Sequence, residues 1–128
     1  MTVQSAMERA LALLPMKPAE SGGLMDFAPM WASLAAAECL PCENAIRAAE
    51  GREELSEAPR FSALRDEIPL CDGILANPFI YALASLAAKD DGDSEWSSTL
   101  RARFSGALQE LTPYVAGGIG DVYGGEGA

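Results

Sequence analysis

The chain has 128 residues, a formal net charge of −10 and no histidine. Its length suits one domain, and the missing histidine removes the commonest general base and the commonest metal ligand. The excess of carboxylates over Lys and Arg argues against direct contact with a nucleic-acid backbone, which attracts proteins through their cations. We therefore expect no catalytic residues and no direct binding to nucleic acid.

The sequence shows no targeting signal and no membrane-spanning segment. Glu8 and Arg9 interrupt the first apolar stretch, and no basic region precedes it. The longest charge-free run, residues 73–88, is too short and too rich in alanine to cross a bilayer. Three cysteines, an odd number, fit a reducing compartment better than a disulfide framework. We expect a cytoplasmic protein that binds no cofactor.

Apolar residues recur at helical spacing from the beginning of the chain. A first helix is predicted over residues 3–14, with Pro15 after it. A second is predicted over residues 26–39. Because proline disfavours helix in the residue before it and is accepted in a first helical turn, Pro41 is predicted to begin a separate third helix over residues 41–50. The second helix carries an apolar stripe of Phe27, Met30, Trp31 and Leu34.

Three further helices are predicted in the second half of the chain. Prolines at both ends delimit a short fourth helix over residues 59–68. An Asn-Pro pair begins a fifth over residues 78–91, and its apolar residues on nearly all sides are typical of the buried centre of a bundle. Asp93 or Ser94 is expected to cap a sixth helix that ends at Pro113.

These elements predict an all-α protein, a compact bundle of five or six helices. No alternation typical of strands and no internal repeat is found. Residues 1–113 are predicted to form a single helical domain. Residues 114–128 are predicted to form a glycine-rich C-terminal tail, since the glycines there lack the strand, helix and lysine of a phosphate-binding loop.

Cys39 and Cys42 have the spacing of a thiol redox site. If a helix begins at Pro41, its dipole would stabilise a thiolate nearby. The thioredoxin-type context is a strand before that helix, whereas the residues before Cys39 are typical of a helix. The alternative is two small, semi-buried residues at a corner between helices, which pack as small hydrophobic side chains. A zinc site would need Cys71 and a carboxylate such as Asp72 in place of a histidine, so no metal site is predicted.

Residues 90–95, Asp-Asp-Gly-Asp-Ser-Glu, have part of the spacing of a calcium loop. Trp96 stands where that loop needs glycine, and Ala102 stands where it needs glutamate. A helix that ends at Gly92, followed by one whose N-terminus favours acidic side chains, explains the same residues. We predict no cation site here.

Two groups of acidic residues are the candidate partner-binding residues. Members of the first are three and four residues apart, so a continuous helix would place them on one face, although Gly51 interrupts the pattern. An acidic face attracts a basic partner and disfavours others. The first group is Glu50, Glu53, Glu54 and Glu57, and the second is Asp90, Asp91, Asp93 and Glu95.

The sequence predicts a non-enzymatic protein-binding module: a regulator, adaptor or inhibitor that contacts a protein partner through an acidic or an apolar helix face. An acidic face predicts a partner with a basic surface. One alternative is an acidic nucleic-acid mimic that inhibits a nuclease complex, of the anti-restriction or anti-CRISPR type, although nine Lys and Arg dilute the charge. A further alternative is a thiol redox protein that uses Cys39 and Cys42. Membrane binding is not expected, and the alanine-rich helices allow a homo-oligomer.

Overall fold

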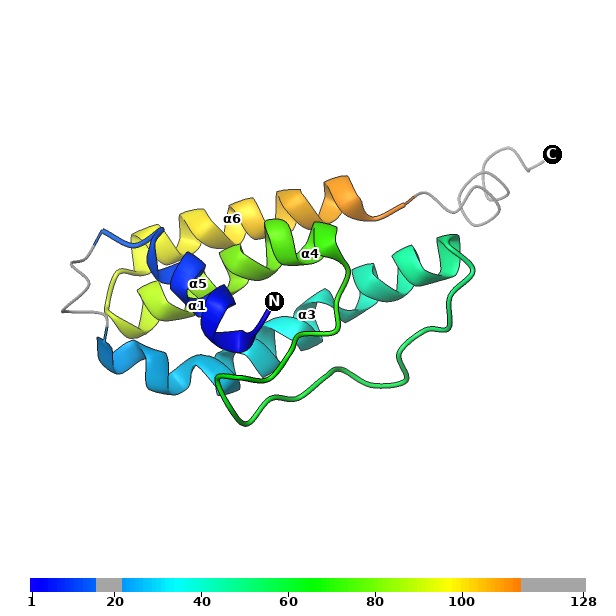
Figure 1. Cartoon of the computed structure of the whole chain (residues 1–128). Helices are drawn as coiled ribbons and strands as arrows, with labels where there is room; N and C mark the ends of the chain where they lie inside the picture. The colour runs from blue at the N-terminus through cyan, green and yellow to red at the C-terminus, as the bar shows by residue number, and fades with distance from the viewer. Residues whose placement is uncertain (16–21, 114–128) are drawn as a thin grey trace.

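The computed structural model describes residues 1–15 and 22–113, so the predicted glycine-rich tail lies outside the described residues. The described chain is mostly helical (Figure 1). Its elements are α1 (Val3–Leu11), the 3-10 helix η1 (Gly22–Phe27), α3 (Ala28–Ala49), α4 (Asp72–Ala76), α5 (Pro78–Asp90) and α6 (Ser94–Leu111). Within the described residues, β-structure is limited to one isolated bridge between Thr2 and Glu67. The predicted all-α class is confirmed.

Helix α5 forms the centre of the core, as its apolar sequence predicts. It packs against α1, α3, α4 and α6. Nine of its 13 residues are buried, and the side chains of Phe79 and Leu83 are fully inaccessible. A helix that is apolar on nearly all sides is stable only when neighbouring elements cover each side. The surrounding helices therefore pack around α5 and cover its apolar sides.

Local signals set the connection from α5 to α6, and both helices lie where they are predicted. Gly92 between them has a φ of +86°, a backbone conformation that glycine adopts without strain. Asp93 caps α6, because its Oδ1 accepts a hydrogen bond from the backbone N–H of Trp96 at 3.0 Å. The two helices run antiparallel side by side (Figure 1).

The predicted separation of residues 26–39 from residues 41–50 is wrong, because α3 continues through Pro41 as one helix. Proline in a helix removes one backbone hydrogen bond and crowds the carbonyl group four residues earlier. Pro41 itself is exposed, whereas Cys39 before it and Cys42 after it are buried. The free energy gained by burying both halves of the helix against the core outweighs the local cost of proline.

The predicted helix over residues 59–68 is also wrong. Residues 50–71, which we call the long loop, contain no helix and follow α3 back along its length (Figure 1). Side chains of α3 form hydrogen bonds with backbone groups of the loop. The Asn44 amide donates to the carbonyl of Leu55 at 3.0 Å and accepts from its N–H at 2.8 Å. Ser33 Oγ accepts from the N–H of Phe61 at 2.9 Å. With these groups paired, the loop needs no helical hydrogen bonds.

The buried carboxylate of Glu43 joins the two ends of the long loop to α3. One oxygen accepts a hydrogen bond from the N–H of Cys71 at 2.8 Å, and the other accepts from Arg47 Nε at 2.6 Å. Arg47 also donates to the carbonyl oxygens of Glu53 and Pro69. A carboxylate with no exposed surface is tolerated only when it is paired in this way.

The end of the long loop also meets the beginning of the chain. The N–H of Val3 donates to the carbonyl of Asp66 at 2.9 Å, and the N–H of Ile68 donates to the carbonyl of Met1 at 3.0 Å. These bonds place α1 beside the loop and against α5. Two of the predicted helices form the single helix α3, and the predicted helix over residues 59–68 is absent. The short helix α4 was not predicted. The division into five or six helices is therefore not confirmed.

Pro41→Ala is expected to stabilise the protein. Alanine restores a helical hydrogen bond and relieves the crowding of the proline ring, which costs about 3 kcal/mol inside a helix. Proline also restricts the unfolded chain by roughly 0.4–1 kcal/mol, so we expect a net gain of about 2 kcal/mol in urea unfolding. An unchanged or lower stability would instead indicate a separate helix that begins at Pro41.

Glu43→Ala is expected to lower the free energy of unfolding by about 3 kcal/mol, because it leaves Arg47 and the N–H of Cys71 without their buried partner. The matched control is Glu53→Gln, at an exposed side chain, which should change stability by less than about 0.5 kcal/mol. Urea unfolding measures both variants. Equal effects would contradict the assignment of Glu43 as the anchor of the loop.

Candidate functional site

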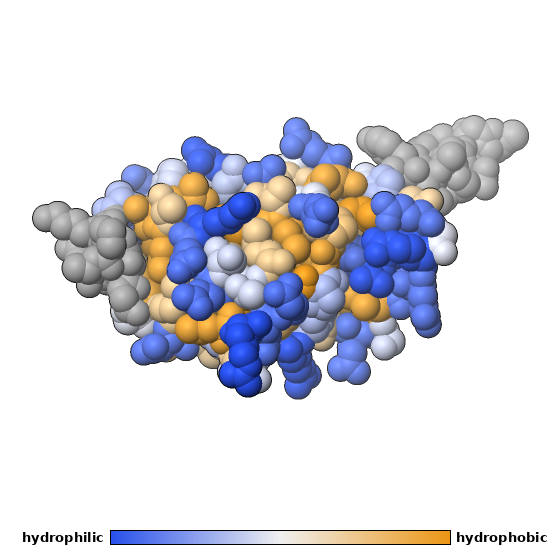
Figure 2. Space-filling model, viewed as in Figure 1, coloured by the Kyte–Doolittle hydropathy of each residue, from blue (hydrophilic) through white to orange (hydrophobic). Residues whose placement is uncertain are grey.

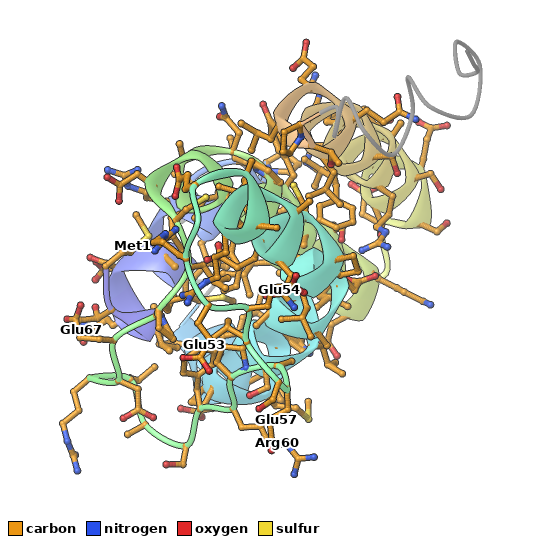
Figure 3. The ribbon with its side chains drawn as sticks, turned by 90° about the vertical axis from the view of Figure 1, so that its right-hand side faces the viewer. Met1, Glu53, Glu54, Glu57, Arg60 and Glu67 are labelled. Atoms are coloured by element: carbon orange, nitrogen blue, oxygen red, sulfur yellow. The ribbon has the colours of Figure 1, made fainter. Side chains whose placement is uncertain are left out.

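The first predicted acidic group does not line a helix face. Helix α3 ends before Glu50, and Gly51 takes a left-handed φ of +73°, so the chain leaves the helix there. The continuous helix that would place these residues on one face is therefore absent, and the chain leaves the helix at the Gly51 that interrupts the pattern. Glu53, Glu54 and Glu57 lie at separate points along the long loop (Figure 3). Figure 2 shows hydrophilic residues gathered at this end of the molecule and along the edge that the loop follows.

The second acidic group lies in the turn between α5 and α6, at the opposite end of the molecule (Figure 1). Asp90 and Asp91 are exposed there, and so is Glu95 in the first turn of α6. Asp93 is partly buried and caps α6, as described above. The eight predicted carboxylates therefore do not form one surface.

An apolar row at the beginning of α3 is exposed. Phe27, Met30 and Leu34 expose 42%, 55% and 49% of their surface, and they are the exposed large hydrophobic side chains of the described residues. Because they are three and four residues apart, they lie along one side of the helix. We call them the α3 stripe. Trp31, which the sequence groups with them, is buried and stacks on the ring of Phe27 with 5.2 Å between centroids.

A groove of about 800 Å³ continues from the α3 stripe, between α3, α5 and α6. Leu34 belongs to both the stripe and the groove, and Leu86 and Lys89 line the groove from α5. Arg101 and Glu38 form an ion pair in its wall, with two hydrogen bonds of 3.0 Å and 2.6 Å. The groove thus combines three apolar side chains with four serines, the ammonium group of Lys89 and one ion pair.

The cysteines of the predicted redox pair lie inside α3, not at a helix N-terminus. Burial, and then the neighbouring Cys42 and Glu38, raise the pKa of the Cys39 thiol to about 12. Nucleophilic and redox-active thiols have lowered pKa values instead. Burial also raises the pKa of Cys71, and all three cysteines are free. The helix-dipole argument for a redox site is therefore wrong, and Cys39 has the environment of a core residue.

No other class of site emerges from the chain as far as it is described. Among residues 1–15 and 22–113, no group of three or more Cys, Asp or Glu side chains is placed so that it could hold a metal ion. Within the same part of the chain, no helix combines the length and the apolar composition needed to cross a membrane. The α3 stripe with its groove is the candidate site.

The raised pKa of Cys39 predicts a loss of stability in alkali. The thiol ionises near pH 9.0 in the unfolded chain but stays protonated up to about pH 12 in the folded protein. The stabilisation is therefore fully present below pH 9 and is lost as the pH rises toward 12, because only the unfolded state gives up its proton. In urea unfolding between about pH 8 and pH 11, Cys39→Ala should lose less stability than the wild type.

Thiol labelling provides an independent check. With an aromatic disulfide reagent near pH 8, the partly exposed Cys71 should react in the native protein, whereas Cys39 should react only on unfolding. Fast labelling of Cys39 in the native protein would contradict its placement.

Comparisons with known proteins add no relative to these observations. No protein-family model matches the chain. Searches of curated proteins and of solved structures likewise found no significant match.

Proposed function

We propose that the protein is a non-enzymatic binding module whose α3 stripe takes up an apolar segment of a protein partner. The observation that carries this proposal is the row of Phe27, Met30 and Leu34, each about half exposed, beside a groove. A contiguous apolar surface of this kind on a protein of high net charge is typical of an interaction site. Regulator, adaptor and inhibitor are roles that such a module could serve.

The backbone that carries the α3 stripe, and the ring of Phe27, are held in place by the rest of the protein. The ring of Phe27 stacks on buried Trp31, and α3 is held by α5 on one side and by the long loop on another. A surface that is already ordered loses less conformational entropy on binding than a flexible one. An apolar row at spacings of three and four fits the helix-in-groove mode of recognition, in which a partner helix lays its apolar face along the row.

The two alternatives have less support. A nucleic-acid mimic needs carboxylates in a phosphate-like row, whereas the acidic groups lie at opposite ends of the molecule (Figure 1). A thiol redox function needs an accessible thiolate, whereas Cys39 is buried and its pKa is raised. Neither arrangement favours a second candidate function.

The double variant Met30→Gln, Leu34→Gln tests the proposal. Both side chains are exposed, so we expect an unchanged fold but at least tenfold weaker retention of the partner, because two apolar anchors are lost. The measurement is affinity capture from the native host at low and high salt, read by mass spectrometry. The matched control is Glu53→Gln, Glu54→Gln, also at exposed positions, which should retain the partner.

A partner that the stripe variant retains as well as the wild type does would contradict the proposal. Retention that falls steeply with salt and is displaced by nucleic acid would indicate mimicry instead. Thermal unfolding of each variant separates loss of binding from loss of fold.

A further inference from the structure

We propose that the occupant of the α3 stripe is an amphipathic helix with basic side chains at one end, and that this end lies against the acidic turn between α5 and α6. This inference rests on the proposed function of the stripe and specifies the chemistry of the partner. It is carried by the position of the stripe relative to the charges around it.

The stripe runs toward the acidic turn. Helices α3 and α5 pack against each other and run in opposite directions, so the beginning of α3 and the end of α5 lie at the same end of the molecule (Figure 1). Leu34 and Lys89 line one groove. From Leu34 the stripe continues toward Phe27 for about 10 Å, while α5 continues from Lys89 into the turn. A helix that covers the stripe therefore brings one end to the turn.

The charge at that end of the molecule is negative. Asp26, Asp90, Asp91 and Glu95 are exposed there, and they outnumber the exposed Lys89 beside them. Farther along the groove, Arg101 is already paired with Glu38, so the charges in the wall compensate each other. The stripe thus has one acidic end and one nearly neutral end. A partner with Lys or Arg at one end gains complementary charge in only one of the two orientations along the stripe.

The same charges disfavour a second copy of this chain as the occupant. Each copy carries a net charge of −10. Pairing two stripes side by side in parallel would bring both acidic turns together, and an antiparallel pair would place each turn against a wall whose charges are already paired. Neither arrangement supplies the further cations that would balance the excess of carboxylates at the turn.

The test uses three fluorescein-labelled peptides of about 18 residues, enough for an amphipathic helix of five turns. The first has a leucine face and lysines at one end. The second replaces those lysines by glutamates. The third keeps the lysines and replaces the leucines by glutamines. Fluorescence anisotropy with the full-length protein measures each dissociation constant. We expect the first peptide to bind about tenfold more tightly than the second, and the third not to bind.

Two matched protein variants locate the basic end. Asp90→Asn, Asp91→Asn and the control Glu53→Gln, Glu54→Gln each remove two exposed carboxylates, at opposite ends of the molecule. The first variant should bind the lysine peptide about fivefold or more weakly than the wild type, and the control should bind it with nearly unchanged affinity. Equal weakening by both variants would assign the effect to net charge and would overturn the placement of the basic end at the turn.

The remaining outcomes separate this inference from the proposed function. If the lysine and glutamate peptides bind equally, and neither binds the variant Met30→Gln, Leu34→Gln, the stripe is a binding surface and the inference of a basic partner is overturned. If the stripe variant binds the lysine peptide as the wild type does, both proposals fail. This inference also fails if the lysine peptide does not bind at about 100 μM, or if sedimentation shows a dimer that the stripe variant does not form. In either case, the capture experiment still tests the proposed binding function of the stripe.

Discussion

The buried carboxylate of Glu43 is the constraint on which the rest of the structure depends. Its hydrogen bonds to Arg47 and to the N–H of Cys71 connect the end of α3 with the residue just before α4, 28 positions later in the chain. Glu43 lies two residues after Pro41, in the part of α3 that continues past the proline as one helix. The long loop is then fixed along α3 by Asn44 and Ser33. Together, the loop and α5 cover two sides of α3 and leave the α3 stripe uncovered.

Elements set by local chemistry could be predicted from the sequence, and those set by distant contacts could not. Helices α5 and α6 lie where they are predicted because Pro78 in the first turn of α5, Gly92 and the Asp93 cap are local signals, although the predicted cap Asn77 makes no side-chain capping bond. Pro41 gives an equally clear local signal, but the burial of Cys39 and Cys42 overrides it. The long loop replaces a predicted helix because its hydrogen-bond partners lie in α3, and no pattern within the loop indicates them.

The candidate site could be predicted only in part, for a related reason. The spacing of Phe27, Met30, Trp31 and Leu34 predicts one apolar stripe, and such stripes are usually buried. Which member faces the core depends on the neighbouring elements, and only Trp31 does. The acidic residues can be identified from the sequence by their charge. A common face for the first group would require a helix that continues past Glu50, and α3 ends before that residue. Composition gives the number of charged residues, whereas their positions in space depend on where the helices end.

The distribution of side-chain size around α3 is the strongest reason to assign the stripe to binding. The buried side of the helix is mostly alanine and cysteine, with Ala28, Ala32, Ala35 and Ala36 fully inaccessible. Small residues there let α3 approach α5 closely but contribute little buried apolar area. The larger Met30 and Leu34 face outward and leave about half of their surface exposed, and that exposed half adds nothing to the stability of the isolated chain. A helix shaped by stability alone would have the opposite arrangement, with large apolar residues inside and polar ones outside. This arrangement supports the proposed binding function, in which the exposed half of these side chains would be buried by a partner.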